Sequence, residues 1–332
     1  MQDVESPAHP CCRPAAKEPH PGRPGEYAQR LVFGRHVSGY WLGGLLLVVA
    51  ATSMWSTSGT FIALVKRSTG ISAQGLAFWR DLTTFLCLFI GARLIQPAWL
   101  RVDRRDLPRL AAMGAVGIGG FHILWNLSVE LNGVPVATVL QYNAPVFVAI
   151  VSWLLWREQF RWPKLVAIGL ALAGTVIISD PSSLGAAPIT PLGLLVGLGT
   201  SIAFGAFALI AKQLVGSYSR WTVLLYVFGF GMLATVPFQF SAPLVPVWPL
   251  PWVGVGAFVG LILLTTIVGF GLYAAGLRRL PASVATLVAT MEVPFAAVVA
   301  YFVLNEKLNT WQMLGAALIV AGVILVSCAD SQ

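Results

Sequence analysis

A series of apolar runs, each about 20 residues long, extends from Tyr40 to Cys328. A helix of about 20 residues crosses a hydrocarbon layer of about 30 Å, and it satisfies its own backbone hydrogen bonds where no water is present. Charged residues make up only 10% of the chain, whereas an ordinary soluble domain contains roughly 25%. The sequence therefore predicts an all-α polytopic membrane protein and excludes a water-soluble globule.

Glycines, prolines and charged clusters divide the apolar sequence into ten segments, which we expect to be ten transmembrane helices. These segments cover residues 41–65, 73–95, 107–128, 133–155, 162–179, 191–214, 221–241, 251–275, 282–304 and 309–328. Residues 1–39 contain six prolines, mixed charges and no apolar core of the signal-peptide kind. We expect a disordered cytoplasmic tail there. No disulfide framework is predicted, because two of the four cysteines are adjacent in this tail.

Part of the sequence recurs at an offset of 148 residues, in or beside apolar segments of both halves. The matching pairs are Thr52 and Thr200, Ser53 and Ser201, Val136 and Val284, Ala137 and Ala285, Thr138 and Thr286, Glu158 and Glu306, Ala173 and Ala321, Gly174 and Gly322, and Ser179 and Ser327. Membrane proteins built from two copies of one unit place a solute site between them. We therefore expect two five-helix repeats, covering residues 40–180 and 190–328.

The distribution of Lys and Arg gives the topology. With a cytoplasmic N-terminus, the tail and the inside loops hold 17 of the 21 Lys and Arg residues, and the outside loops hold 3. Cytoplasmic loops carry this excess in membrane proteins. We therefore expect a plasma-membrane protein with both termini on the cytoplasmic side. Because five helices per copy is an odd number, the second repeat enters from the opposite side. The sequence thus predicts two inverted repeats.

Glu292 is the strongest candidate for a functional side chain. It lies eleven residues after Pro281, a depth of about 16 Å at 1.5 Å per residue and close to the bilayer midplane. A charge in hydrocarbon is costly, so an embedded carboxyl group is a functional candidate by default. Such a group suits the binding and release of a proton, or contact with a cationic solute. The alternative is a protonated or hydrogen-bonded packing residue.

Two prolines predict helix kinks near the same depth, Pro145 in the first repeat and Pro294 in the second. Their register is shifted by one residue from the 148 offset, which implies a small local adjustment. Polar residues beside each proline are expected to form two related patches that face a cavity. These are Gln141, Tyr142 and Asn143 in the first repeat, and Thr290 with Glu292 in the second.

Arg80 and Asp81 lie within the second apolar segment. Adjacent residues point about 100° apart on a helix, so we expect Arg80 to hold an anionic group of the solute, or to pair with Glu292, rather than with Asp81. Snorkelling toward the interface is the alternative. His122 and Asn126 share one face of the third segment at i, i+4 spacing, although a lone histidine more often packs than binds. No metal site is predicted, since no second ligand has the required spacing.

These features together resemble the EamA-type members of the drug/metabolite transporter superfamily, over residues 41 to 328. The resemblance rests on the stretch from Val136 to Pro145 with Glu158 and Gly174, and on its second copy from Val284 to Pro294 with Glu306 and Gly322. Trp55 and Arg80 also resemble an early tryptophan and arginine of that family, but their counterparts in the second unit are Ala203 and Phe228. The resemblance implies transport of small organic metabolites or drugs, often outward and ion-linked.

The first hypothesis is a secondary transporter, working as an exporter of small metabolites such as amino acids, with Glu292 as proton or cation site and Arg80 near the solute. The second is an exporter of hydrophobic cations that uses Glu292 with Trp55, Trp125 and Tyr142. A membrane enzyme acting on lipid-linked substrates is a remote alternative. It would need a cluster of acid and base groups, whereas Asp81, His122 and Glu292 are few and lie on separate segments. The expected partners are the lipid bilayer, the solute, a proton or other cation, and a second copy in a homodimer. Neither nucleic acid nor a cofactor is expected, and no ATP-binding loop occurs.

Overall fold

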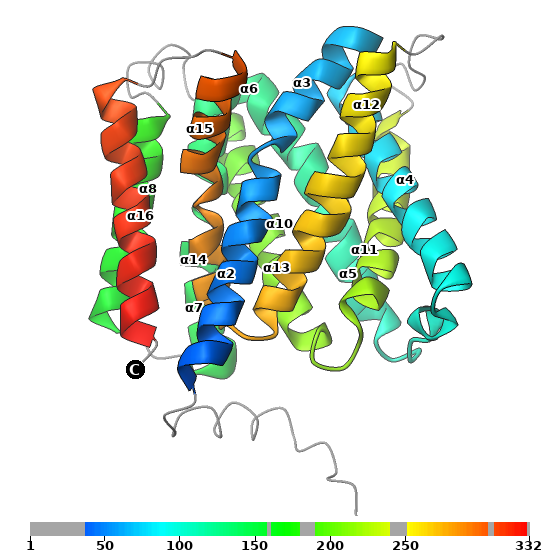
Figure 1. The fold of residues 1–332 in the computed structure, drawn as a ribbon, viewed down its shortest axis with the longest axis horizontal. Helices are drawn as coiled ribbons and strands as arrows, with labels where there is room; N and C mark the ends of the chain where they lie inside the picture. The colour runs from blue at the N-terminus through cyan, green and yellow to red at the C-terminus, as the bar shows by residue number, and fades with distance from the viewer. Residues whose placement is uncertain (1–36, 158–160, 180–189, 240–250, 305–308, 331–332) are drawn as a thin grey trace, which may run out of the picture. The chain divides into compact units, whose positions relative to one another are not determined.

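The computed structural model describes residues 37–157, 161–179, 190–239, 251–304 and 309–330. In these ranges every regular element is a helix (Figure 1). The α-helices are α2 (Val37–Trp55), α3 (Ser58–Thr69), α4 (Ala73–Leu94), α5 (Leu107–Gly114), α6 (Phe121–Gln141), α7 (Ala144–Trp156), α8 (Trp162–Ile178), α10 (Pro191–Leu214), α11 (Arg220–Thr235), α12 (Trp252–Gly260), α13 (Gly269–Leu277), α14 (Ala282–Ala289), α15 (Glu292–Leu304) and α16 (Thr310–Asp330). The short helices are η1 (Pro97–Leu100), η2 (Ala115–Gly120), η3 (Val236–Gln239) and η4 (Leu261–Val268).

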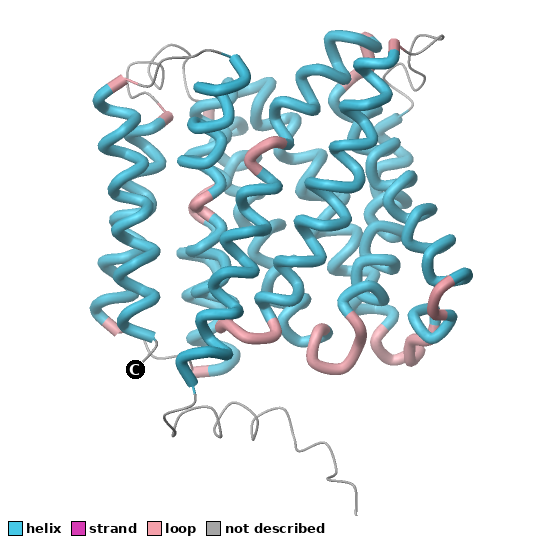
Figure 2. The backbone as a smooth tube through the Cα atoms, in the orientation of Figure 1, coloured by secondary structure: helices cyan, strands magenta, loops and turns pink. Residues whose placement is uncertain are grey.

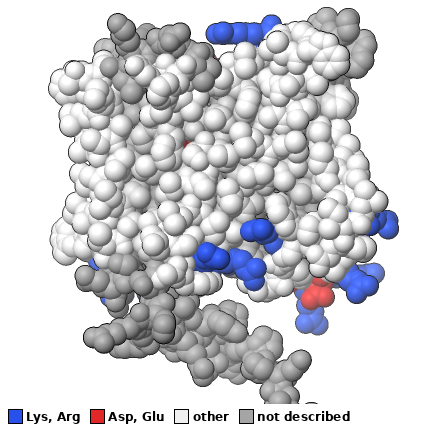
Figure 3. Space-filling view, viewed as in Figure 1, with Lys and Arg blue, Asp and Glu red and all other residues white. Residues whose placement is uncertain are grey.

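Eight helical spans of the described chain are long and apolar enough to cross a membrane, and two shorter apolar helices cover Trp162–Ile178 and Arg220–Thr235. The prediction of an all-helical, multi-pass membrane protein is confirmed. Each of the ten expected segments overlaps at least one helix. The expected tail lies almost entirely outside the described residues. Lys and Arg side chains gather at the end of the helical unit where α2 begins, with a smaller group at the opposite end (Figure 3).

Both proline positions coincide with complete helix breaks. The helix α6 ends at Gln141 and α7 begins at Ala144, while α14 ends at Ala289 and α15 begins at Glu292. Each proline lies in the first turn of the second helix, where its missing N–H removes no hydrogen bond. The two breaks match at the 148 offset even though the prolines do not, so the one-residue adjustment falls just after the break.

Three further irregularities lie in the long spans. Between α2 and α3, the Ser56 and Thr57 hydroxyls donate to the carbonyls of Ser53 and Met54, at 2.8 and 2.7 Å. Such hydroxyls compete with the backbone ladder and loosen a helix. The segments η2 and η4 are π-helical, a geometry that occurs often at functional sites. Figure 2 shows the interruptions between α2 and α3 and between α14 and α15 as short loops.

The helices α8 and α16 pack closely, side by side in Figure 1. A Cβ on Gly174 would lie 2.5 Å from the carbonyl oxygen of Gly315, and a Cβ on Gly315 would lie 2.7 Å from that of Gly174. A Cβ on Gly322 would lie 2.7 Å from the carbonyl oxygen of Ala167. Small residues therefore set the distance between these helices, as they do at many membrane helix interfaces.

We expect Gly315→Val to lower the free energy of unfolding by about 1–3 kcal/mol, the range for overpacking, since the new side chain meets backbone atoms of α8. Thermal unfolding of the purified protein measures this loss. The matched control is Gly169→Val on α8, where a Cβ would meet nothing within 4 Å. An equal loss in both variants would contradict the close packing described here.

Candidate functional site

A small cavity of about 80 Å³ lies inside the helical unit, among the interrupted helices. Its walls combine apolar rings with polar and charged groups from both halves of the chain. The lining residues are Trp55, Ser58, Arg80, Phe121, His122, Gln141, Tyr142, Phe204, Thr265, Thr266, Phe270, Ala289 and Glu292. Of the residues proposed from the sequence, six meet here: Trp55, Arg80, His122, Gln141, Tyr142 and Glu292.

Every helix interruption described above contributes to this cavity. Trp55 and Ser58 flank the break after α2, Phe121 and His122 follow the π-helical η2, and Thr265 and Thr266 belong to η4; Gln141, Tyr142, Ala289 and Glu292 flank the two proline breaks. Irregular backbone is tolerated at membrane depth only where it is buried in protein or lines a cavity. The interruptions and the cavity are therefore one structural feature.

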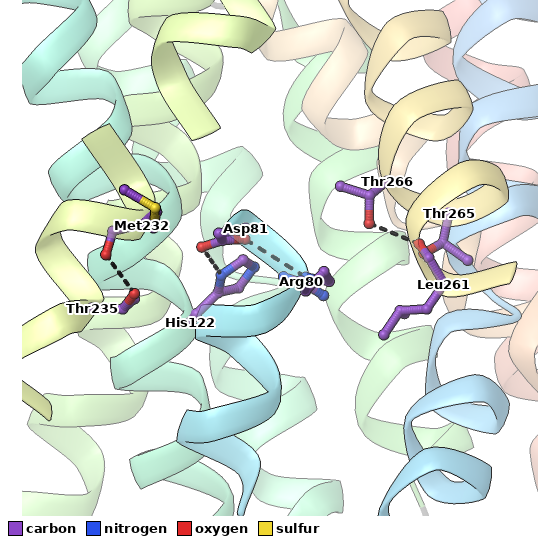
Figure 4. A network of polar contacts seen from close by, with 8 residues as sticks. All are labelled: Arg80, Asp81, His122, Met232, Thr235, Leu261, Thr265 and Thr266. Carbon is purple, nitrogen blue, oxygen red and sulfur yellow. Dashed lines mark hydrogen bonds and ion pairs between the residues drawn. The ribbon is translucent and has the colours of Figure 1, made fainter. Parts of the chain in front are cut away.

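Arg80 and His122, which line the cavity, form a buried polar cluster with Asp81 (Figure 4). The Oδ2 atom of Asp81 lies 3.1 Å from Nδ1 of His122, and Oδ1 lies 3.8 Å from Nε of Arg80. The expectation that Arg80 and Asp81 do not interact was wrong. The Asp81 side chain is fully buried, and a buried carboxylate without cationic or hydrogen-bonding neighbours would be very costly.

The carboxyl group among the lining residues is that of Glu292, the first residue of α15. The Tyr142 hydroxyl, from the break between α6 and α7, donates a hydrogen bond to the Glu292 carboxyl group. A carboxylate at a helix N-terminus is also stabilised by the helix dipole, by about 0.3–1 kcal/mol. Among the ion pairs of the described residues, none joins Glu292 to Arg80. Both side chains nevertheless line the same cavity.

Several polar atoms around the cavity have no hydrogen-bond partner although they are buried. These atoms are Nε1 of Trp55, Nε of Arg80, Oδ1 of Asp81 and Nε2 of His122. An unsatisfied buried polar group costs about 1–3 kcal/mol, and native proteins keep few of them. Three of these four residues line the cavity. The arrangement thus offers both donors and acceptors to a polar solute.

The apolar part of the wall is a group of packed aromatic rings. The Trp55 ring lies 4.9 Å from that of Phe270 and 6.1 Å from that of Phe204, measured between centroids. Sequence reasoning missed Phe121, Phe204 and Phe270, and proposed Trp125, which does not line the cavity. It also missed Thr265 and Thr266, which donate to the Leu261 carbonyl at 2.7 and 2.8 Å in η4 (Figure 4).

Three proposed residues lie away from the cavity lining. The Asn143 amide donates to the carbonyl of Val139 at 3.0 Å, and the Thr290 hydroxyl donates to that of Leu287 at 2.6 Å. These two side chains therefore satisfy carbonyls at the ends of the broken helices. Asn126 is partly buried and does not line the cavity. In the part of the chain that the structure describes, no three His, Cys, Asp or Glu residues are placed to hold a metal ion.

Comparison with known proteins identifies the family. The profile of the EamA-like transporter family matches residues 42–180 and again residues 191–328. The chain belongs to the EamA-like transporter family. The resemblance to EamA-type members of the drug/metabolite transporter superfamily is thereby confirmed, and the family indicates a transporter rather than an enzyme.

Relatives of this EamA-like transporter cover most of its length. It is 28% identical to an uncharacterized transporter of Bacillus subtilis, YwfM, over 86% of this chain and 93% of the relative. It is 26% identical to a probable terminal-alkyne amino-acid exporter of Streptantibioticus cattleyicolor, over 84% of this chain and 92% of the relative. A protein crystal structure matches the fold with a TM-score of 0.72 and 19% identity, over 86% of this chain and 96% of the solved chain.

Proposed function

We propose that this EamA-like transporter exports small zwitterionic metabolites, such as amino acids, across the plasma membrane by alternating access. The observation that carries the proposal is the presence of Arg80 and Glu292 in the lining of one cavity. A guanidinium group recognises a carboxylate through a planar fork of donors, while a carboxylate accepts from an ammonium group. A zwitterion presents both partners at once and leaves neither protein charge unpaired.

The charges near the cavity also support coupling to a proton or another cation. With His122 neutral and both carboxyl groups ionised, the formal charges of Arg80, Asp81 and Glu292 sum to one excess negative charge. A proton or another cation on Glu292 removes this excess, and the ammonium group of a zwitterion takes its place when the solute binds. Because an uncompensated buried charge costs several kcal/mol, the site favours uptake of a proton or a cation. We propose Glu292 as the group that holds it.

We propose ten membrane-spanning helices in two inverted repeats with both termini inside, and the contacts of α8 with α16 support the inversion. Gly174 meets Gly315, and Gly322 meets Ala167. At the 148 offset, Gly174 corresponds to Gly322 and Gly315 corresponds to Ala167. The second contact is therefore the equivalent of the first with the two repeats exchanged. A two-fold axis between the helices produces this pattern. The cavity of about 80 Å³ is far smaller than a ligand pocket of about 300–1,000 Å³. Rocking of one repeat against the other would enlarge it on alternate sides.

The direction and the class of solute draw support from a relative whose name describes a probable exporter of an amino acid. Export of hydrophobic cations is the second candidate. The aromatic rings of Trp55, Phe204 and Phe270, together with Glu292, favour it because a cation binds both to a carboxylate and to ring faces. Arg80 counts against it, since a permanent positive charge in the same cavity repels a second one.

Untargeted analysis of the medium tests the choice between these candidates. Cells that produce the protein should release one or a few amino acids several-fold faster than cells that produce Glu292→Gln at the same level. Resistance to hydrophobic cations should stay the same in both. Enhanced resistance without amino-acid release would replace the first candidate by the second.

A further inference from the structure

A second and larger cavity, of about 610 Å³, opens at the end of the helical unit where Lys and Arg side chains gather (Figure 3). The start of α2, the short helix η1, the start of α11 and the turn after α13 form its walls. None of its lining residues belongs to the cavity that contains Arg80 and Glu292. Its volume lies within the range of ligand pockets, about 300–1,000 Å³.

Three arginines line this cavity: Arg220, Arg278 and Arg279. The guanidinium of Arg220 lies 5.0 Å from the centroid of the Trp221 ring, and that of Arg279 lies 5.3 Å from the centroid of the Tyr40 ring. No acidic residue is among the lining residues, and none of the three arginines forms an ion pair within the described part of the chain. The aromatic faces orient the guanidinium groups but leave their positive charge uncompensated.

The backbone adds to the positive potential. Arg220 is the first residue of α11, a 16-residue helix whose N-cap is Ser219. The N-terminal end of a helix is positive, so a cation there is placed unfavourably. Bound anions at such an end gain from the helix dipole and the free N–H groups. An anion in this cavity would therefore offset both the arginines and the helix terminus.

The turn that carries Arg278 and Arg279 is held in place by hydrogen bonds from α10. Nζ of Lys212, on α10, donates to the carbonyls of Leu277 and Leu280 at 2.6 and 2.7 Å. These bonds satisfy carbonyl groups at the end of α13 and fix the turn. A fixed turn loses little conformational entropy when a ligand binds, so the backbone that carries the two guanidinium groups is preorganised.

We propose that this cavity binds the phosphate of an anionic phospholipid. Basic pockets between membrane helices on the cytoplasmic side recognise such head groups, and Tyr and Trp rings favour this level of the bilayer. Exposed apolar side chains adjoin the lining residues in sequence: Leu42 near Tyr40, and Leu94 and Ile95 before Gln96. They offer a surface for acyl chains. The walls come from both halves of the chain, so the bound lipid would join the two halves at this end.

Lipid binding to the purified full-length protein tests this proposal by native mass spectrometry and thermal unfolding. Phosphatidylglycerol should bind and raise the unfolding temperature, whereas phosphatidylcholine should do neither. The triple variant R220Q/R278Q/R279Q should bind phosphatidylglycerol at least about tenfold more weakly. The double variant R278K/R279K, which keeps the charge, should retain part of the binding. The control is Arg93→Gln, another exposed arginine that lies over an aromatic ring, that of Phe89 at 5.5 Å.

Two results would overturn the proposal. The first is equal binding of phosphatidylglycerol by the unmodified protein and by the triple variant, with both proteins monodisperse and similarly stable without lipid. The second is equal stabilisation by glycerol 3-phosphate, which has no acyl chains, since the cavity would then take a free phosphate compound and not a lipid.

Discussion

Glu292→Gln should reduce accumulation driven by a pH gradient at least about 100-fold in proteoliposomes. An amide cannot release a proton or neutralise an ammonium group, and loss of a buried charge interaction of about 3 kcal/mol corresponds to roughly that factor. Folding should survive, because the amide oxygen can still accept the hydrogen bond that the Tyr142 hydroxyl donates to Glu292. Uptake of a labelled amino acid into these proteoliposomes under an imposed pH gradient measures the effect.

The matched control is Glu130→Gln, which makes the same chemical change at an exposed position. Glu130 accepts a hydrogen bond of 3.2 Å from Gln74 and lies outside the cavity, so its variant should transport normally. Normal pH-dependent transport by Glu292→Gln would remove Glu292 from the coupling mechanism. Loss of flux in both variants would point to a general effect of charge removal.

Arg80→Lys should weaken the binding of carboxylate-bearing solutes by about 10–100-fold. The ammonium of lysine keeps the charge beside Asp81 but loses the planar fork, and a hydrogen bond to a charged group contributes about 1.5–3 kcal/mol. The corresponding decarboxylated amine should bind equally to both proteins, because it has no group for Arg80 to hold. Competition against labelled substrate in proteoliposomes measures both affinities.

The control for this prediction is Arg67→Lys, at an exposed position on α3. A selective loss for carboxylate-bearing solutes in the Arg80 variant, and no loss in the control, is the expected pattern. If Arg80→Lys binds the amino acid and the amine with the same affinities as the unmodified protein, Arg80 serves only to balance the charge of Asp81. The proposed recognition of a zwitterion would then be wrong.

The membrane fold could be predicted from the sequence because its signals are local. Apolar runs of about 20 residues have few other solutions in lipid, and Pro145 and Pro294 mark the breaks at which α7 and α15 begin. The depth of Glu292 follows from counting residues from Pro281. These inferences need no knowledge of how distant segments pack.

The remainder of the site depends on packing between helices. Asp81 and His122 are 41 residues apart in the chain, and nothing in either segment indicates that the two side chains meet. Phe204 and Phe270 are two apolar residues among many, so their role in the cavity wall appears only when α10 and α13 are placed beside Trp55. Thr265 and Thr266 offer one weak signal, a hydroxyl pair in an otherwise apolar run.

A structure of the protein with an amino acid bound tests the central claim most directly. The ligand should be the amino acid that producing cells release fastest, at a resolution that distinguishes its carboxylate from its amino group. The proposal predicts the carboxylate within hydrogen-bond distance of the Arg80 guanidinium and the amino group beside the Glu292 carboxyl. A ligand bound outside the cavity lined by Trp55 and Phe270, or one that touches neither charged residue, would contradict it.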